Sequence, residues 1–405
     1  MVNIGIIGYG VVGSGVYEVI KTNTESIASK AGQEVRVLKI LDIRDFPEHE
    51  EPELFTKEFD DLLDDRISIV VETMGGAGIA YEFTKKLLAA GKSVVTSNKE
   101  LVATYGAQLM VLAKENGVRY LFEASVGGGI PIVHPLSQCL AANAISAIHG
   151  ILNGTTNYIL TKMFREGVAY ADALSEAQRF GYAEKDPTAD VDGHDTCRKI
   201  AILTSLVYGS QIKCDKIPTE GIRNITGDDV AFADKLGCSI KLIGYSRVKN
   251  GAVTARVCPM MIPRKNPLST VEDVFNGILV HGNAIGDVMF YGRGAGKLPT
   301  ASAVVADVIE IIKAPVNSST YFWKEEKENT YADLGDEETA YCVRVHESAL
   351  SSAIAAFGNV EITSLRQEIG FVTPVMKETD FNARLSGVKS VISKIKMYTE
   401  QGEQV

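Results

Sequence analysis

The chain has 405 residues, a length that predicts two or three domains rather than one hydrophobic core. Apolar residues make up 45% and charged residues 23%, which excludes a disordered or collagen-like chain and indicates a folded, enzyme-sized protein. Lys and Arg number 41 against 51 Asp and Glu, a formal net charge of −10. We expect no nucleic-acid partner, because no basic stripe offsets that charge.

Cysteine usage and the N-terminus indicate the compartment. The six cysteines are dispersed without C-x-x-C spacing, so neither a zinc ribbon nor a disulfide framework is predicted. The chain begins directly with an apolar strand, without a basic leader, and no run of about 18 apolar residues occurs. We therefore expect a cytoplasmic protein that does not enter a membrane.

Strands and helices alternate over the first third of the chain. The pattern predicts a doubly wound parallel sheet of the Rossmann type, in a dinucleotide-binding domain over residues 1–134. The predicted strands are Val2–Ile7, Val35–Leu41, Ile67–Val71, Ser93–Thr96 and Arg119–Glu123, and two of the helices between them are Tyr81–Ala90 and Leu101–Glu115.

The alternation ends at a glycine cluster, residues 126–129. Residues 135–298 mix long helices with antiparallel-looking strands, which predicts a separate α+β domain. A helix from about Thr300 to Lys313 follows, and we assign about 299–315 to the first domain. Residues 316–338 have few aliphatic side chains and predict a linker held to a surface by Tyr321-Phe322-Trp323. Residues 339–405 carry a strand–helix–strand pattern of their own.

A G-x-G-x-x-G sequence, Gly8, Gly10 and Gly13, lies between the first strand and the first helix. The backbone there can approach a pyrophosphate closely, and the helix N-terminus offers N–H groups. The sequence therefore favours a dinucleotide site rather than a glycine-rich turn that binds no ligand. At the end of the second strand, Asp42 or Asp45 would favour a ribose 2′-hydroxyl and Arg44 a 2′-phosphate. NAD and NADP are both open at this point.

Two lysines and a group of acids stand at positions suited to chemistry. Lys99 follows a parallel strand, at the edge where α/β ligands bind, and Asp195 and Lys199 share one helix face at i and i+4. Spacing alone favours simpler interpretations: a solvated loop lysine, a helix cap by Asp192 and a surface ion pair. The functional hypothesis is that carboxylates hold a substrate ammonium while a lysine shielded from water transfers a proton.

Other polar segments are weaker candidates. Asn153-Gly154-Thr155-Thr156-Asn157 predicts a helix start with donors for a carboxylate or the cofactor. Asp190, Asp192 and His194 lack the spacing of a calcium loop, so no metal is predicted there. Cys139 has apolar neighbours and no close cation, which favours a core thiol over a nucleophile.

Taken together, residues 1 to about 315 resemble homoserine dehydrogenase, which interconverts homoserine and aspartate 4-semialdehyde. The resemblance is carried by G-x-G-x-x-G, by Thr96-Ser97-Asn98-Lys99, and by Glu123 to Pro131 (EASVGGGIP). It continues in Asn153 to Asn157, in Gly181-Tyr182-Ala183-Glu184 with Asp186-Pro187, Asp190, Gly193, Asp195 and Lys199, and in Gly292 to Val304 (GRGAGKLPTASAV).

The resemblance implies roles for particular residues. Lys199 would exchange the proton at the C4 oxygen, and Lys99 would lie between nicotinamide and substrate. Residues implied at the homoserine site are Glu184, Asp195, Asp190, Tyr182, Gly181 and Thr155. Those implied at the NAD(P) site are Gly8, Gly10, Val11, Val12, Gly13, Arg44, Thr73, Gly75, Ser97, Asn98, Lys99, Gly181, Glu184 and Gly294. A structural sodium ion is implied at the Glu123 carboxylate and the carbonyls of Val126, Gly128 and Ile130.

The resemblance also implies a monofunctional enzyme of threonine, methionine and isoleucine biosynthesis, which forms a homodimer or a dimer of dimers. Residues 135–298 would then bind substrate, carry catalysis and form the dimer, and 339–405 resemble an ACT regulatory domain. Its first strand would be Tyr341–Val345 and its first helix Ala349–Phe357, but His346-Glu347-Ser348 replaces the usual Asp-x-Pro-Gly turn. We expect the fold to persist with a weak or absent amino-acid pocket.

Two other functions would also use a dinucleotide site. A semialdehyde-oxidising dehydrogenase would need a reactive cysteine beside the nicotinamide. A non-enzymatic redox sensor would bind dinucleotide and signal through 339–405, but it would have no use for an ammonium-binding set of acids.

Overall fold

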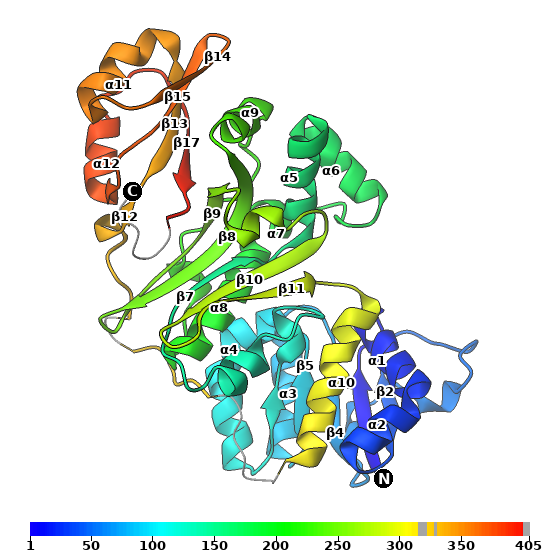
Figure 1. The fold of residues 1–405 in the computed structure, drawn as a ribbon. Helices are drawn as coiled ribbons and strands as arrows, with labels where there is room; N and C mark the ends of the chain where they lie inside the picture. Colours follow the sequence, from blue (N-terminus) through cyan, green and yellow to red (C-terminus); the bar gives the residue numbers. More distant parts are fainter. Residues whose placement is uncertain (315–321, 328–329, 400–405) are drawn as a thin grey trace. The chain divides into compact units, whose positions relative to one another are not determined.

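The computed structural model describes residues 1–314, 322–327 and 330–399 (Figure 1). The chain forms two compact units. The first comprises Met1–Ile145, Arg198–Lys216 and His281–Glu328, and the second Ser146–Cys197, Ile217–Val280 and Asn329–Val405. Among the described residues, no helix has the length and apolar character needed to cross a membrane.

The first unit is built on the predicted parallel sheet, with strand order β3-β2-β1-β4-β5-β6. The strands pair in parallel, and Ile4, Ile6, Val70 and Val71 are fully buried, as expected for a sheet covered on both faces. The Rossmann-type prediction is confirmed. The bounds are β1 (Val2–Ile7), β2 (Val35–Leu41), β3 (Phe55–Thr56), β4 (Ile67–Glu72), β5 (Ser93–Thr96), β6 (Tyr120–Leu121), α1 (Val11–Thr22), α2 (Thr24–Ala31), α3 (Gly78–Ala89) and α4 (Lys99–Glu115).

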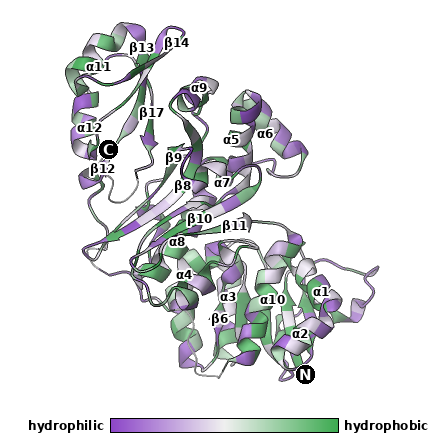
Figure 2. Cartoon of the chain, viewed as in Figure 1, coloured by the Kyte–Doolittle hydropathy of each residue, from purple (hydrophilic) through white to green (hydrophobic). Residues whose placement is uncertain are grey.

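Helix α10 (Lys297–Lys313) packs against α1 in this unit. The approach is close at Gly15, where a Cβ would lie 2.8 Å from the carbonyl oxygen of Lys297. The helix is largely hydrophobic in Figure 2, and seven of its residues are buried. Beyond it, Trp323 in the predicted linker is fully buried and donates a hydrogen bond of 2.8 Å to Gln211 Oε1. Tyr321 lies outside the described residues.

The second unit carries a mixed sheet, in which the order β10-β7-β8-β9 continues into β17-β13-β15-β14. Strands β8 and β9 pair antiparallel along their whole length and are joined by Asn250-Gly251, both with positive φ, the sequence that a tight two-residue hairpin favours. The bounds are β7 (Ile145–Ile151), β8 (Cys238–Lys249), β9 (Ala252–Pro263), β10 (Phe275–Gly282), α5 (Gly154–Glu166), α6 (Tyr170–Arg179), α7 (Thr188–Val191) and α9 (Gly227–Lys235).

Helix α8 (His194–Tyr208) begins in the second unit and continues into the first, so that it carries Asp195 in one and Lys199 in the other. Strand β10 likewise leads the chain back to the first unit, where β11 (Gly286–Arg293) follows. The sequence reasoning named neither β10 nor β11. Helix α9 begins at Gly227, directly after Thr226, because Thr226 and Asp229 form a reciprocal capping box.

Apart from the two-residue strand β16 (Met376–Lys377), which pairs with β12 (Glu338–Thr339), residues 341–397 fold in the order strand, helix, strand, strand, helix, strand, and these four strands pair antiparallel. They enclose a core of their own around Val343, Phe371 and Phe381. The last strand also pairs in parallel with β9, at Lys396 and Met397. The bounds are β13 (Tyr341–His346), α11 (Leu350–Phe357), β14 (Ile362–Leu365), β15 (Glu368–Val372), α12 (Glu378–Leu385) and β17 (Val391–Met397).

Candidate active site

The glycine turn of the first unit leads directly into α1. A Cβ at Gly13 would lie 1.9 Å from the Gly8 carbonyl oxygen, so the turn closes only with glycine there. Thr73, directly after β4, donates a hydrogen bond of 2.8 Å from Oγ1 to the Gly8 carbonyl and so stabilises the turn. Gly10 faces open space and is the N-cap of α1 without a side-chain cap. The first N–H groups of this helix can therefore receive a pyrophosphate.

Asp42 and Arg44 lie at the end of β2, beside the glycine turn. Asp42 Oδ1 accepts hydrogen bonds from Nε and the backbone N–H of Arg44, and Oδ2 accepts from Arg44 Nη2 and the Tyr9 N–H. The Arg44 guanidinium beside Asp42 holds the pKa of that carboxyl well below its usual range. Asp42 is buried, whereas the Arg44 side chain is 56% exposed.

A buried acid organises the turn that carries Lys99. Glu72 is fully buried at the end of β4, and its carboxylate accepts hydrogen bonds from Thr96 Oγ1 at 2.6 Å and the Met74 N–H at 2.7 Å. Burial raises the pKa of Glu72 to about 7. Asn98 accepts from the Leu101 N–H and so caps α4, whose first residue is Lys99. No role was predicted for Glu72. The signal that could have indicated a buried acid was its position directly after the apolar strand Ile67–Val71.

Helix α8 carries Lys199, which is 7% exposed. Its neighbour Arg198 forms an ion pair of 3.3 Å with Glu100, which follows Lys99 in α4. The two lysine-bearing segments are thus neighbours within the first unit. The sequence pointed to both lysines but gave no signal for the ion pair between Arg198 and Glu100.

In the second unit, the Asn153 side chain gathers two predicted acids. Its Nδ2 donates to Asp190 Oδ1 at 2.7 Å and to Asp195 Oδ2 at 2.9 Å, although these acids follow it by 37 and 42 residues. Its Oδ1 accepts from the Thr156 N–H, the N-cap bond of α5. Asn153 is 5% exposed and Asp195 3% exposed, so the hydrogen bond between these two residues is shielded from water. The predicted helix start therefore also orients two carboxylates.

Tyr182 joins the same region through its backbone. Thr155 Oγ1 donates a hydrogen bond of 2.5 Å to the Tyr182 carbonyl, and the Tyr182 ring packs edge-on against Tyr158. Gly181 has φ +74 and follows the end of α6. Glu184 is exposed, and its carbonyl accepts from Gln178 Nε2. Its carboxylate is not part of the Asn153 bridge.

The Glu123 carboxylate accepts three backbone N–H groups, those of Ile132 and Val133 at Oε1 and of His134 at Oε2. Burial raises the pKa of Glu123, against the lowering effect of these hydrogen bonds. A cation would thus share a carboxylate that already anchors a loop. The carbonyl oxygens of Val126, Gly128 and Ile130 accept no hydrogen bond within the part of the chain that the structure describes. They fit a cation that prefers oxygen ligands.

Other candidates are placed elsewhere. Asp192 pairs with Arg223, whose Nη2 lies 3.2 Å from Asp192 Oδ2, and it ends α7 instead of capping α8. The described ranges hold no group of three His, Cys, Asp or Glu side chains suited to a metal ion. Gly75 has open space at its Cβ position, and the Gly294 carbonyl packs against Gly128.

Comparison with known proteins gives a consistent result along the chain. The family model described as "Homoserine dehydrogenase, NAD binding domain" matches residues 8–123, and the one described as "Homoserine dehydrogenase" matches residues 131–309. The chain is similar to the homoserine dehydrogenase of Corynebacterium glutamicum, with 39% identity over 399 residues that cover 95% of this chain and 88% of that protein.

Two solved structures are similar to this fold. A homoserine dehydrogenase from Thiobacillus denitrificans matches with a TM-score of 0.89 and 35% identity, covering 98% of each chain. A hyperthermophilic archaeal homoserine dehydrogenase in complex with NADPH matches with a TM-score of 0.65 and 32% identity, covering 78% of this chain and 98% of that one.

Proposed function

The chain belongs to the homoserine dehydrogenase family, and from that membership we propose how its own residues carry the reaction. It is an NAD(P)-dependent oxidoreductase that interconverts L-homoserine and L-aspartate 4-semialdehyde, a step of amino-acid biosynthesis.

We propose that Asp195, with Asp190 and Glu184, binds the homoserine ammonium. Support comes from the Asn153 amide, which holds the Asp190 and Asp195 carboxylates side by side. Asn153 is neutral and leaves their charge for a cation, and a charge-assisted hydrogen bond is about twice as strong as a neutral one. Gly181, Tyr182 and Thr155 would form the wall of this subsite.

Lys199 in its neutral form would accept the proton of the homoserine C4 hydroxyl. The dinucleotide, when bound, supplies the acceptor for the hydride that leaves C4, so the carbon is oxidised to the aldehyde as its O–H proton passes to Lys199. In the reverse direction protonated Lys199 returns that proton. Its burial, and its position one helical turn after Asp195 in α8, support this role. Lys99 would orient the substrate oxygen toward the nicotinamide.

For the dinucleotide, we propose the glycine turn of Gly8, Gly10 and Gly13, with Val11 and Val12 at the start of α1, as the pyrophosphate site. Thr73, Gly75, Ser97, Asn98, Gly181, Glu184 and Gly294 would line the remainder. Each oxygen of the Asp42 carboxylate already accepts two hydrogen bonds from Tyr9 and Arg44. Asp42 therefore has no acceptor position left for a ribose hydroxyl. The half-exposed Arg44 guanidinium suits a 2′-phosphate, so we propose a preference for NADP over NAD.

We propose a sodium ion at the carbonyls of Val126, Gly128 and Ile130. The Glu123 carboxylate would hold the loop through its backbone hydrogen bonds and would also provide negative charge to the ion. The three unbonded carbonyls support it. A crystal grown with sodium should contain an ion with oxygen ligands at this loop; nitrogen or sulfur ligands would contradict the proposal.

We also propose a division into domains. Residues 1–134 and about 299–315 form the dinucleotide-binding domain, and residues 135–298 form the substrate-binding and catalytic domain. Residues 316–338 are a linker, and residues 339–405 form an ACT-like domain. The strand and helix order of 341–397, with its own core, supports the last of these. A homodimer or dimer of dimers and a cytoplasmic location complete the proposal, the latter supported by the buried thiols Cys238, Cys258 and Cys342.

The observation that carries the residue assignment is the Asn153 bridge to Asp190 and Asp195, in a chain that both family models match. The test is an assay of the purified protein with homoserine at alkaline pH, in which absorbance of the reduced nicotinamide is followed with NAD and with NADP. No reduction with either dinucleotide would contradict the function. Activity that survives thiol alkylation would exclude a cysteine-dependent semialdehyde oxidation.

A further inference from the structure

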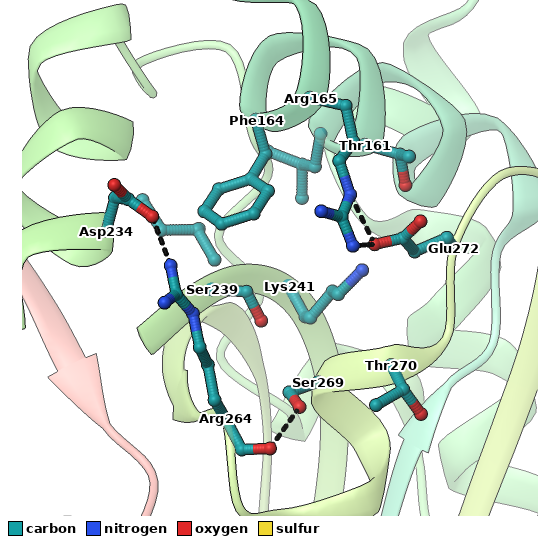
Figure 3. Close-up of a pocket in the computed structure, with 12 residues that line it drawn as sticks. Thr161, Phe164, Arg165, Asp234, Ser239, Lys241, Arg264, Ser269, Thr270 and Glu272 are labelled. Atoms are coloured by element: carbon teal, nitrogen blue, oxygen red, sulfur yellow. Dashed lines mark hydrogen bonds and ion pairs between the residues drawn. The ribbon is translucent and has the colours of Figure 1, made fainter. Parts of the chain in front are cut away.

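A cavity of about 630 Å³ in the second unit is lined by residues to which no role has been given. It lies between the C-terminal half of α5, the start of β8 and the segment 264–272 (Figure 3). Its charged and hydroxyl side chains include Arg165, Ser239, Lys241, Arg264 and Thr270. None of these belongs to the substrate or dinucleotide residues proposed above.

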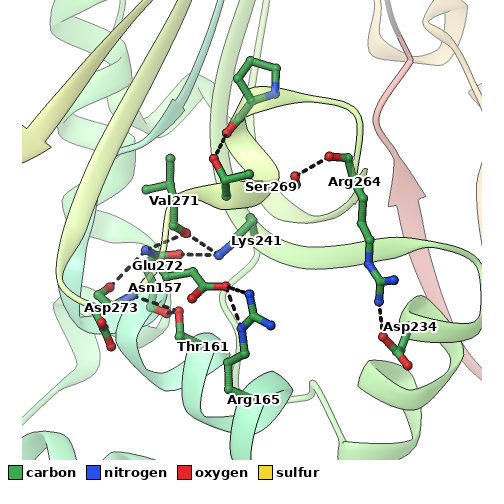
Figure 4. Close-up of polar contacts among 12 residues, drawn as sticks. Asn157, Thr161, Arg165, Asp234, Lys241, Arg264, Ser269, Val271, Glu272 and Asp273 are labelled. Carbon is green, nitrogen blue, oxygen red and sulfur yellow. Dashed lines mark hydrogen bonds and ion pairs between the residues drawn. The ribbon is translucent and has the colours of Figure 1, made fainter.

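Lys241 is the central feature of this cavity. The residue is 3% exposed, and its ammonium donates to two neutral oxygens, Asn157 Oδ1 at 3.1 Å and the Val271 carbonyl (Figure 4). Its third proton has no partner among the described residues. Burial lowers the pKa of Lys241 to about 8. A buried cation held by neutral acceptors is costly, and an anion at its third proton would relieve that cost.

Ser239 adds a second donor on the same side. It precedes Lys241 by two residues in β8, so both side chains leave the same face of the strand. The Ser239 hydroxyl oxygen is fully buried and has no hydrogen-bond partner within the described ranges, and the residue is 7% exposed. Buried hydroxyls are normally hydrogen-bonded, so an unpartnered one that lines a cavity indicates a missing acceptor or water.

The charges around Lys241 leave the cavity positive. Arg165 pairs with Glu272, with Nε 2.8 Å from Oε1, and Arg264 pairs with Asp234. Each lining carboxylate is therefore matched by an arginine, and Lys241 is the additional cation (Figure 4). Asp273, on the adjacent loop, exerts a smaller attraction on Lys241 than Glu272 does.

We propose that this cavity binds a tetrahedral oxyanion, such as a phosphate group, through the Lys241 ammonium and the Ser239 hydroxyl. The Nη1 groups of Arg165 and Arg264, which their carboxylate partners do not use, would complete the donor set at the rim. The donor set consists of one ammonium, one hydroxyl and two guanidinium groups. Four such donors match the several oxygen atoms of a tetrahedral oxyanion better than the two oxygen atoms of a planar carboxylate.

The test is isothermal titration calorimetry of the full-length protein with sulfate, at saturating reduced dinucleotide so that the cofactor's own phosphate positions are occupied. Sulfate carries no titrating proton in this range. At about pH 8.5, binding should therefore draw a proton onto Lys241, which buffers of different ionisation enthalpy would reveal. Inorganic phosphate should behave like sulfate, and acetate should bind at least several-fold more weakly. Acetate binding as tightly as sulfate would overturn the tetrahedral assignment.

Two variants and one matched control isolate the cavity. Lys241→Met should weaken sulfate binding at least tenfold and abolish the proton uptake, whereas Lys249→Met, at the exposed end of the same strand, should change neither. Ser239→Ala breaks no hydrogen bond of the described structure and should weaken binding roughly fivefold. The absence of saturable binding in the wild-type chain, or equal binding in wild type and Ser239→Ala, would overturn the proposal. Homoserine turnover is not the readout, so the reaction and this site are tested separately.

Discussion

The Asn153 amide donates a hydrogen bond of 2.9 Å to Oδ2 of Asp195, a carboxylate that is 3% exposed. The Asn153 side chain, which also caps α5, thus contributes to the orientation of Asp195. If Asp195 binds the substrate ammonium, that orientation governs substrate affinity and leaves dinucleotide affinity alone.

Asp195→Asn should raise KM for homoserine or lower kcat/KM by roughly ten- to a hundredfold, since a neutral amide cannot replace a charge-assisted hydrogen bond to an ammonium. Asn153→Ala should act in the same direction with a smaller effect. Dinucleotide affinity, measured by fluorescence titration, should stay unchanged in both variants. If it collapses in Asp195→Asn, the residue is structural and not a substrate ligand.

Lys199→Ala should lower kcat by about 10²–10⁴, the range typical of losing a positioned proton-transfer group. The control is Lys249→Ala, which removes an exposed lysine from β8 and should leave kcat unchanged. Circular dichroism would verify that both variants are folded. A fall of less than threefold in folded Lys199→Ala would exclude proton transfer through this residue.

Arg44→Ser should raise KM for NADP at least tenfold and change KM for NAD little, because the guanidinium is proposed to meet only the 2′-phosphate. Arg36→Ser, which removes an exposed arginine that lies on β2 and pairs with Glu34, is the matched control. Equal losses with both dinucleotides would mean that Arg44 serves chiefly to hold Asp42 and the glycine turn.

Stability should fall as pH rises through the folded pKa of Glu72. Burial raises that pKa to about 7, above its unfolded value, so the folded state binds the extra proton and is favoured at low pH. The unfolding free energy of Glu72→Gln should therefore rise by about 3 kcal/mol relative to that of wild type between roughly pH 4.5 and pH 8. Urea unfolding at a series of pH values measures this, and a pH-independent difference would contradict the buried-acid account.

Threonine should inhibit feebly. The turn after β13 is filled by His346-Glu347-Ser348, and the Ser348 N–H already donates to His346 Nδ1 at 3.3 Å, so an N–H that a ligand carboxylate would need is engaged. Initial rates at saturating homoserine, with threonine up to millimolar levels, measure the effect. Strong inhibition that disappears in a chain ending near residue 330 would show a working sensor. Loss of the dimer in that shorter chain, with threonine-insensitive rates, would indicate a structural role.

Local sequence carried much of the fold and part of the site. The alternation from Val2 to Glu123 predicted the parallel sheet, and the glycine spacing placed the dinucleotide turn between β1 and α1, because periodicity and backbone conformation act over a few residues. Homoserine dehydrogenase membership, first indicated by motif resemblance, was confirmed by the comparisons.

Only the tertiary structure decided which distant groups meet. Glu72 stands directly before Thr73, which the resemblance implied at the NAD(P) site, yet the burial of Glu72 and its bond to Thr96 depend on the pairing of β4 with β5. Asp192 was expected to cap a helix and instead pairs with Arg223, 31 residues away. Asn153 likewise reaches Asp190 and Asp195 across more than 35 residues. Local periodicity records neither sequence-distant contacts nor the loss of water around a buried carboxyl, and those two effects determine the charge and orientation of a site.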